Sequence, residues 1–383
     1  MTADRVSVDL AASPGQIIET SRVRLRPFRE SDADDIAAGC SDALTQRFMP
    51  GLPSPYTRQD ALWWITTGAP AAAAAGGAGL AIADLESDRL LGGVGIGRVL
   101  TERAQAEIGY WVAPWARRAG IATAAATALA SWAFARGHAR LELLTEPENA
   151  PSQRVALSAG FRREGLRRGA AARRDGSRYD LIAWVRLSGD PEGPTPRVLP
   201  DLPGGALTDG VITLRPLAAD DADFIEALHQ VPDVVATSVP PHVPERADVE
   251  ARCGRAQSRW LAGERADLMI IDRASGAPAG ELSLYYQEPQ TGQAMVGYCM
   301  MPAWRGRGYM TRAVGLVSRW AFGQAGIARL TAGTRPDNIG SQRVLERAGF
   351  QREGFQRARL PGPDGTRIDD VVFGLLPQDL ATP

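Results

Sequence analysis

Lysine is absent from this sequence of 383 residues, so all 43 basic side chains are arginine. Any cationic contact to a phosphate must therefore come from arginine, while helix termini and backbone N–H groups supply the neutral donors. The formal net charge is only −1 at pH 7. A chain this close to neutrality carries no overall field that attracts nucleic acid or an anionic membrane, which argues against a nucleic-acid-binding protein.

Cysteine and histidine are scarce too. Each occurs three times: Cys40, Cys253, Cys299, His138, His229 and His242. The cysteines are far apart and odd in number, which favours neither a disulfide framework nor a zinc site built on paired cysteines. The histidines show no ligand spacing, so the sequence predicts a reduced protein without a metal site.

No run of apolar residues is long enough to cross a bilayer. The most apolar stretch, Ala69–Ala83, has 15 residues, mostly Ala and Gly, whereas a spanning helix needs about 20. The first residues, MTADRVSVDLAASPGQ, contain acidic side chains and no apolar core, unlike a secretory signal peptide. We therefore expect a cytoplasmic protein that does not enter a membrane.

What the sequence does contain is an internal repeat with a period of about 189 residues. Thr145–Gly165 (TEPENAPSQRVALSAGFRREG) matches Thr334–Gly354 (TRPDNIGSQRVLERAGFQREG) at 13 of 21 positions. Shorter matches extend it in both directions: VRLRP with ITLRP, EIGY with MVGY, and DGSRYD with DGTRID. Solenoid repeats are only about 20–50 residues long, so this one indicates a whole domain that was duplicated and fused.

The boundary between the two halves is marked by composition. The segment Ser188–Gly210 holds five prolines and several glycines between two apolar stretches, which is typical of a loop or linker. We predict an N-terminal domain over residues 20–188, a linker over 189–208 and a C-terminal domain over 209–380.

Both halves predict the same order of elements. A final strand pair is expected in each half after five earlier strands: 22–28, 80–85, 90–100, 106–112 and 140–145, matched by 211–217, 268–271, 280–286, 294–300 and 329–333. An acid-rich helix start follows the first strand, with Ser31 or Asp220 as its expected N-cap. A long helix (121–136; 309–324) and a short one (152–159; 341–348) come later. Strands first and helices interleaved later predict an α+β fold with a mixed sheet.

The first motif that carries chemistry is an arginine- and glycine-containing loop that enters the long helix. It reads Arg117-Arg118-Ala119-Gly120-Ile121-Ala122-Thr123 in one half and Arg305-Gly306-Arg307-Gly308-Tyr309-Met310-Thr311 in the other. Unpaired N–H groups of a helix start bind anions, and glycine lets the backbone come close. The loop therefore predicts a diphosphate site, and a plain strand-to-helix turn with solvated arginines is the alternative.

The second motif begins at Asn149 and Asn338 and continues to Ser152 and Ser341, before a Gly-Phe pair. Asparagine offers a donor and an acceptor to a chain that bears amides, and serine offers a hydroxyl proton. The alternative is local: the asparagine or serine caps a short helix, and the glycine ends it.

Taken together, VRLRP, EIGYWV, the Arg-x-x-Gly-x-Ala loop and the tract Asn-x-x-Ser…Gly-Phe-x-x-Glu-Gly resemble the GCN5-related N-acetyltransferase (GNAT) superfamily. They resemble most its branch that acetylates ribosomal-protein N-termini. The likeness covers nearly all of each half. It implies two tandem domains, each with a twisted mixed sheet, that transfer acetyl from acetyl-CoA to a primary amine by direct attack in a ternary complex.

The resemblance also implies roles for residues. Arg117–Thr123 and Arg305–Thr311 would hold the CoA pyrophosphate, and Asn149 and Asn338 would contact the pantetheine arm. Ser152 and Ser341 would be the acids for the leaving thiolate. Many members use a tyrosine four residues before the Gly-Phe glycine, but Ala156 and Leu345 stand there. The serines fit the ribosomal-protein branch.

The two halves differ at the expected base. Glu107, in EIGY, is the candidate that would take the acceptor's proton, with a solvated strand carboxylate as the alternative; the C-terminal half has Met295 there, which cannot take a proton. That half would use Glu281, use Asp369, or have lost catalysis. The alternatives to the enzyme reading are thus one catalytic domain beside a scaffold, or an acyl-CoA-binding sensor without turnover.

The partners expected are acetyl-CoA, with CoA as product, and an amine acceptor that is either a peptide N-terminus or a small molecule. The fusion predicts a monomer with pseudo-dimeric domains or a homodimer. Arg162–Arg178 holds seven arginines in 17 residues. These could bind the CoA 3′-phosphate, an acidic peptide or RNA, or form the solvated face of the last hairpin.

Overall fold

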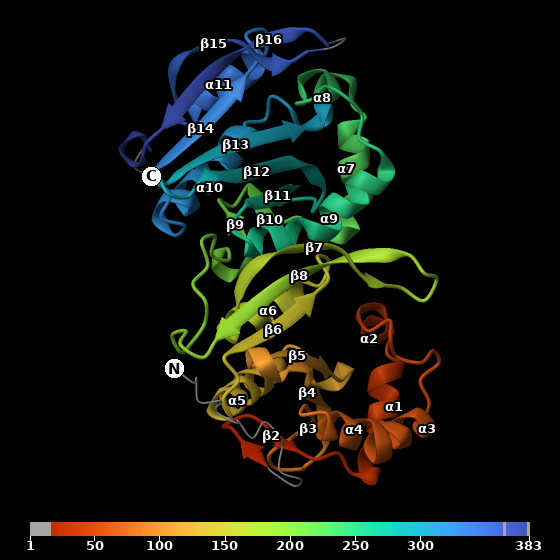
Figure 1. Cartoon of the computed structure of the whole chain (residues 1–383). Helices are drawn as coiled ribbons and strands as arrows, with labels where there is room; N and C mark the ends of the chain where they lie inside the picture. The colour runs from red at the N-terminus through yellow and green to blue at the C-terminus, as the bar shows by residue number, and fades with distance from the viewer. Residues whose placement is uncertain (1–16, 363–364, 381–383) are drawn as a thin grey trace. The chain divides into compact units, whose positions relative to one another are not determined.

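The computed structural model describes residues 17–362 and 365–380, which form two compact units, Met1–Pro196 and Arg197–Pro383 (Figure 1). The N-terminal segment for which no signal peptide was predicted lies outside the described residues. Each unit holds one eight-stranded sheet, and the two sheets have the same strand order. The prediction of an α+β fold with a mixed sheet in each half is confirmed.

The N-terminal unit begins with its edge strands and ends with a long hairpin. Its strands are β1 (Ile18–Glu19), β2 (Arg24–Arg26), β3 (Ala78–Ala83), β4 (Leu90–Leu100), β5 (Gln105–Val112), β6 (Arg140–Thr145), β7 (Arg162–Ala172) and β8 (Arg178–Leu187). Its helices are α1 (Ala33–Ser41), α2 (Ala43–Phe48), α3 (Arg58–Trp63), α4 (Ala69–Ala74), α5 (Ile121–Ala135) and α6 (Ala150–Ser158). The sheet order is β1-β2-β3-β4-β5-β6-β8-β7.

The C-terminal unit repeats this plan. Its strands are β9 (Leu207–Thr208), β10 (Ile212–Pro216), β11 (Arg265–Asp272), β12 (Pro278–Glu288), β13 (Gln293–Met300), β14 (Arg329–Thr334), β15 (Gln351–Pro361) and β16 (Arg367–Leu375). Its helices are α7 (Ala222–His229), α8 (Pro232–Thr237), α9 (Arg246–Leu261), α10 (Tyr309–Gly323) and α11 (Ile339–Arg347).

Each sheet splays apart at its single parallel pair. β5 pairs with β6 from Gln105 only to Glu107, although β5 runs on to Val112. The equivalent pairing of β13 with β14 stops at Met295. All other paired strands are antiparallel. The ends of these two strands are therefore free to line a gap in the sheet, which is where the candidate site lies.

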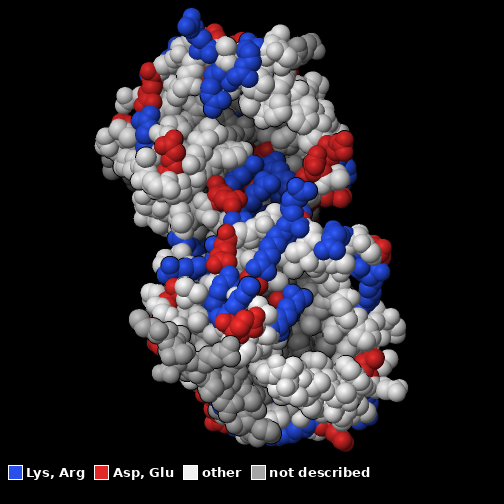
Figure 2. Space-filling view, in the orientation of Figure 1, with Lys and Arg blue, Asp and Glu red and all other residues white. Residues whose placement is uncertain are grey.

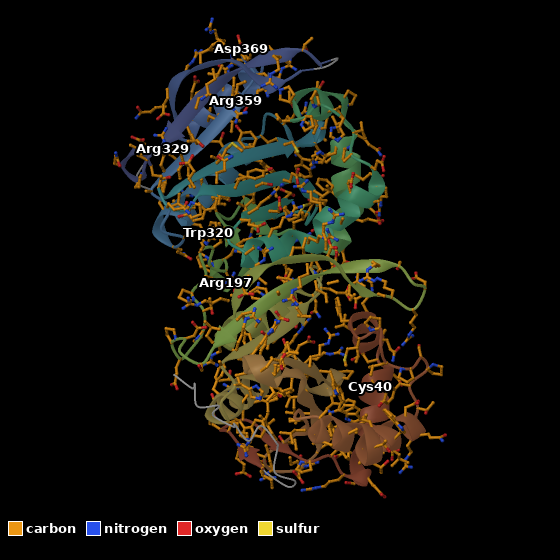
Figure 3. The ribbon with its side chains drawn as sticks, viewed as in Figure 1. Cys40, Arg197, Trp320, Arg329, Arg359 and Asp369 are labelled. Carbon is orange, nitrogen blue, oxygen red and sulfur yellow. The ribbon has the colours of Figure 1, made fainter. Side chains whose placement is uncertain are left out.

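Helices cover both faces of the sheet because strand side chains alternate. In β11, Leu268 and Ile270 belong to the core that contains α10, whereas Met269 packs with α7 and α9. Trp320 of α10 is buried in the core on the α10 face of the sheet (Figure 3). Its ring centroid lies 5.6 Å from that of Trp260. The two-sided packing fixes the splayed strands against α10 and its N-terminus.

An ion pair to an aspartate explains the arginine of each VRLRP-like motif, and in the N-terminal unit this pair is buried. Arg26 is 2% exposed and makes two hydrogen bonds to Asp32, at 2.8 and 2.9 Å. Asp32 also accepts the backbone N–H of Arg29, and Arg215 pairs with Asp221 in the same way. The N-cap predictions were therefore wrong by one residue. The N-cap of α1 is Asp32 rather than Ser31, and the N-cap of α7 is Asp221 rather than Asp220.

The predicted linker is packed rather than free. Thr195 donates its hydroxyl to the carbonyl of Phe161, and Leu199 and Leu202 are buried in the core of the C-terminal unit. The indole of Trp260 donates to the carbonyl of Pro200. The division between units falls after Pro196, within the predicted linker. The domain limits 20–188 and 209–380 themselves stay a prediction.

The alanine-rich stretch divides into two short elements, α4 and β3. Among residues 17–362 and 365–380, no helix combines the length and the apolar character needed to span a bilayer.

Candidate active site at the splayed strands

The start of the long helix keeps its first N–H groups free in both units. Gly120 and Gly308 precede α5 and α10 with φ of 75° each, and no side chain caps either helix. A positive φ of this size favours glycine, which has no Cβ to clash. Residues 306–308 are exposed. Each helix start thus offers the unpaired donors that an anion such as a diphosphate requires.

The arginines of these loops lie in different surroundings. Arg117 hydrogen-bonds the carboxylate of Asp42 and the carbonyl of Val112, and Arg305 bonds Asp233 at 2.9 Å. These two guanidiniums tie the loop to α2 or α8. Arg307 stands over the ring of Trp304, 4.9 Å from its centroid, and Arg118 is exposed. The first arginine of each loop is therefore tied to an aspartate of its own unit, whereas the second arginine is exposed.

The asparagines act as helix caps. Asn149 Oδ1 accepts the backbone N–H of Ser152 at 3.2 Å, and Asn338 Oδ1 accepts that of Ser341 at 3.1 Å. The local alternative weighed for this motif is therefore present in the structure. The cap uses only the side-chain oxygen, which leaves the NH₂ of each asparagine to donate to a ligand.

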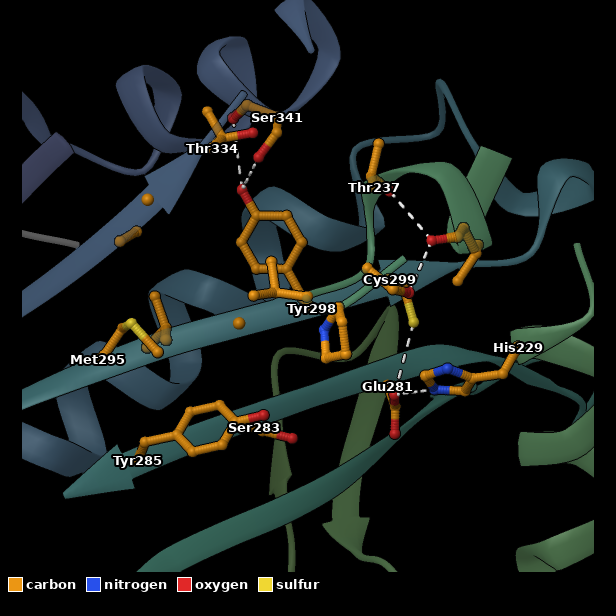
Figure 4. Close-up of a pocket in the computed structure, with 18 of the residues that line it drawn as sticks. His229, Thr237, Glu281, Ser283, Tyr285, Met295, Tyr298, Cys299, Thr334 and Ser341 are labelled. Atoms are coloured by element: carbon orange, nitrogen blue, oxygen red, sulfur yellow. Dashed lines mark hydrogen bonds and ion pairs between the residues drawn. The ribbon is translucent and has the colours of Figure 1, made fainter. Parts of the chain in front are cut away.

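A tyrosine of the splayed strand meets the candidate serine in both units. Tyr110 Oη lies 2.8 Å from Ser152 Oγ, and Tyr298 Oη lies 3.0 Å from Ser341 Oγ (Figure 4). Burial raises the pKa of both phenols, that of Tyr298 to about 12, although the serine bond opposes the shift. Each tyrosine therefore stays protonated and can hold its serine in place. Sequence reasoning missed this pair, although EIGY and MVGY share the tyrosine.

Two cavities of the C-terminal unit meet at Ser341. One, of about 440 Å³, is lined by six of the seven loop residues predicted for the pyrophosphate, and also by Asn338 and Ser341. The six are Arg305, Gly306, Gly308, Tyr309, Met310 and Thr311. The other cavity, of about 500 Å³, shares Tyr298, Asn338 and Ser341 with the first and extends to Met295 and Glu281. The structure thus brings both predicted motifs to one groove and places the serine where it joins a second chamber.

Glu107 is half-buried on β5, and its neighbours are charged. Burial raises the pKa of its carboxyl above the usual value, while Arg98, whose guanidinium lies 3.2 Å away, opposes that shift. Glu142, its register partner on β6, adds to the raise. The side chain is 27% exposed, so it is more enclosed than a solvated strand carboxylate.

The C-terminal unit has a charged cluster that sequence spacing did not reveal. Glu281 accepts hydrogen bonds from Arg252 at 2.6 Å and pairs with His229 at 2.7 Å, and the Cys299 thiol lies 3.5 Å away (Figure 4). Burial favours the neutral acid, but Arg252 and His229 outweigh it and hold the pKa of Glu281 well below its usual range. Glu281 is therefore a poor proton acceptor.

Histidine, glutamate and cysteine ligand atoms within 4.8 Å of one another could in principle hold a cation. Here the guanidinium of Arg252 donates hydrogen bonds to both carboxylate oxygens of Glu281, and it lies 3.4 Å from His229 Nε2. A metal ion would meet that fixed positive charge at short range. We assign no metal to the cluster.

The arginines of 162–178 are mostly engaged within their own unit. Arg167 pairs with Glu142, Arg173 with Glu146, and Arg174 with carbonyls of residues 50 and 52. Figure 2 shows basic and acidic side chains next to one another over the visible face. These three arginines are therefore tied to partners within their own unit, and the ligands considered for the hairpin stay predictions.

Comparisons with known proteins agree with this geometry. The family model described as acetyltransferase (GNAT) domain matches residues 22–162 and 212–351. The probable N-acetyltransferase YjcK of Bacillus subtilis is 42% identical over 86 residues, which cover 22% of this chain and 47% of that protein, about half its length. The uncharacterised N-acetyltransferase YoaA of the same organism is 30% identical over 153 residues, 40% of this chain and 86% of that one.

Among solved structures, Mycobacterium smegmatis RimJ in complex with CoA-disulfide is 22% identical, with a TM-score of 0.40, and the match covers 46% of this chain and 88% of that one. The family match covers most of the chain and recurs in both units. This acyltransferase belongs to the GNAT acetyltransferase family and carries two of its domains in one polypeptide.

Proposed function

We propose that the protein is an acetyl-CoA-dependent N-acetyltransferase that acetylates a primary amine, on a protein N-terminus or a small molecule, by direct attack in a ternary complex. The observation that supports this most is the position of Ser341, at the meeting point of the loop groove and the second cavity. Two substrates that enter from different sides would meet at that hydroxyl. The doubled family match supports the same chemistry for the N-terminal unit.

The residues present fit acetyl-CoA. The uncapped starts of α5 and α10 would receive its pyrophosphate, and the amides of Asn149 and Asn338 would contact its pantetheine arm. When bound, its thioester supplies an activated acetyl group. Ser152 and Ser341 would each give a proton to the departing sulfur, held in place by Tyr110 and Tyr298.

The acceptor must be neutral before it attacks. An α-amine with a pKa of about 8 costs only about 1.4 kcal/mol to deprotonate at pH 7, and a modest base suffices for it. Glu107 fits that task in the N-terminal unit, because its burial favours taking up a proton. The pyrophosphate loops, Ser152, Ser341 and Glu107 are thus the residues that this proposal rests on.

Acetyl-CoA titrated into the wild-type protein is expected to bind at two sites per chain. Replacing Gly308 by valine should remove one of them, because valine at φ 75° is strained and its side chain would stand at the free N–H groups. Replacing Gly120 by valine should remove the other. Nothing lies within 4 Å of a Cβ built on Gly308, so the change should leave the unit folded. Isothermal titration calorimetry gives the stoichiometry directly.

The same titration separates the alternatives. One site in the wild-type chain would make the other unit a scaffold, and the two valine variants would identify which. Two tight sites without any acceptor-dependent release of CoA thiol, tested with peptides and small amines, would contradict the enzyme proposal and favour a sensor.

The acidic limb of the pH–rate profile of the N-terminal unit should move to higher pH in an Arg98→Gln variant. Arg98 is the larger of the two charges that oppose the raised pKa of Glu107, the other being Arg167, so removing it lets burial and Glu142 raise the pKa further. Since Glu107 can act only when deprotonated, more alkaline conditions would be needed. The measurement is kcat/KM against pH in a Gly308→Val background, with exposed Arg103→Gln as the control. An unmoved limb would speak against Glu107 as the base.

A further inference from the structure

The C-terminal unit lacks the base that the N-terminal unit has, although its cavities are well formed. Met295 occupies in β13 the register position that Glu107 occupies in β5. Each is the last residue of its strand that pairs with the parallel neighbour. Met295 also lines the 500 Å³ cavity. A unit that acetylates amines needs another group there to meet the ammonium.

Three acidic residues of the C-terminal unit do not suit the task. Glu281 is held by Arg252 and His229, and its lowered pKa leaves it anionic with little tendency to take up a proton. Asp369 accepts the backbone N–H of Ala358 and lies out on the β15–β16 hairpin (Figure 3). Asp248 lines the same cavity but is exposed on the first turn of α9.

Asp370 is different. It lines the cavity together with Ser341 and Tyr298, is only 7% exposed, and within the described chain no hydrogen-bond partner reaches its Oδ1 atom. The carboxylate receives one hydrogen bond, from the backbone N–H of Thr334. A buried carboxylate oxygen without a partner is costly and marks a place where a donor is expected.

The neighbouring strand β14 has a glycine, Gly333, beside this carboxylate. A Cβ on Gly333 would lie 2.6 Å from Asp370 Oδ2, so no other residue fits there without a shift. By the repeat, Gly333 corresponds to Leu144 and Asp370 to Leu181, so the N-terminal unit fills the same place with two leucines. The two units therefore differ at both positions, and only the C-terminal unit has an acid at this place.

We propose that Asp370 binds the ammonium group of the acceptor in the C-terminal unit and takes up its proton, the task that Glu107 has in the N-terminal unit. This inference rests on the proposed function. The proton passes from the ammonium to a carboxylate oxygen of Asp370. The nitrogen lone pair then forms the bond to the acetyl carbon as the bond from carbon to sulfur breaks. Ser341 protonates the sulfur, the second proton that the nitrogen loses restores the serine hydroxyl, and the proton on Asp370 leaves to solvent with the products. Burial, which raises the pKa of Asp370 against the opposing effects of Arg359 and Thr334, suits such a proton acceptor.

The test uses the full chain with Gly120→Val, so that only the C-terminal unit turns over. Asp370→Asn should lower kcat/KM for a panel of unblocked tripeptides and spermidine by about 10²-fold or more and abolish the acidic limb of the pH profile. Binding of acetyl-CoA should stay at one site, which shows that the unit is folded. Asp369→Asn, the neighbouring change, is the comparison. Unchanged kcat/KM in Asp370→Asn, or a loss in Asp369→Asn instead, would overturn the assignment.

A binding measurement decides the assignment even without turnover. Spermidine titrated into CoA-saturated protein should bind at least about tenfold more weakly to Asp370→Asn, since a charged hydrogen bond is lost. Equal affinity would overturn the role of Asp370. Absence of acceptor-dependent thiol release in the Gly120→Val chain, together with weakened spermidine binding in Asp370→Asn, would instead refute turnover in this unit and keep Asp370 as its amine-binding group.

Discussion

Alanine at position 341 is expected to lower the turnover of the C-terminal unit by about 10²-fold or more, which is the usual contribution of a positioned acid. The Ser341 hydroxyl lies where the two cavities meet and bonds the hydroxyl of Tyr298. Without it, the departing sulfur loses the donor proposed for it, and the Tyr298 hydroxyl would have to take its place. The measurement is kcat in the Gly120→Val background, at several pH values.

The variant should remain folded and should still bind acetyl-CoA. The helix cap uses the backbone N–H of Ser341, which alanine keeps. Tyr298→Phe is the matched comparison: it removes the positioning bond and leaves the serine proton in place, so its loss should be smaller. A wild-type kcat and pH profile in Ser341→Ala would contradict the role, and the same test applies to Ser152 in the Gly308→Val background.

Asp32→Asn is expected to cost the N-terminal unit about 3 kcal/mol of stability, since it breaks a buried ion pair and leaves Arg26 with Asp88, a more exposed carboxylate 3.1 Å away, as its remaining ionic partner. Arg26 and Asp32 are 2% and 4% exposed. At the usual scaling for a unit of this size, the unfolding temperature should fall by about 6–12 °C. Differential scanning calorimetry of the full chain measures it.

Asp34→Asn is the control for this change. Asp34 is an exposed partner of Arg58 with a side chain 81% exposed, and such pairs contribute only about 0–1 kcal/mol. Equal shifts in the two variants would contradict a special role for the buried pair. Asp221→Asn should destabilise the C-terminal unit by a smaller amount, because the Arg215 side chain is 39% exposed, so the two variants together would assign the calorimetric transitions to the units.

Much of the fold could be predicted from the sequence, because each half repeats the same apolar pattern. The ranges 90–100 and 140–145 coincide with β4 and β6, and α5 begins at the expected Ile121. Other ends shifted by one to three residues, and the short helices α2 and α8 were not predicted. Helices of six residues have too few turns to show a period, and they depend on tertiary packing.

The site was predictable where local sequence determines it and not where separate elements meet. Gly120 and Gly308, which precede α5 and α10, could be predicted as a helix start with positive φ from the local sequence alone. The cluster of Glu281, Arg252 and His229 joins β12, α9 and α7, and no spacing along the chain links these residues. The sequence did not show that Arg117 and Arg305 are bound by Asp42 and Asp233. Asp42 is the N-cap of α2 and Asp233 lies in α8, two helices that were not predicted.

Every cation that lines the two cavities of the C-terminal unit and belongs to the described chain, apart from histidine, is an arginine, among them Arg252, Arg335 and Arg359. A guanidinium does not lose its proton at physiological pH, so it is not a nucleophile toward an acyl group. A lysine beside a thioester would be an internal competitor for the acetyl group. With no lysine in the sequence, the cations around these sites hold anions without becoming N-acetylated themselves.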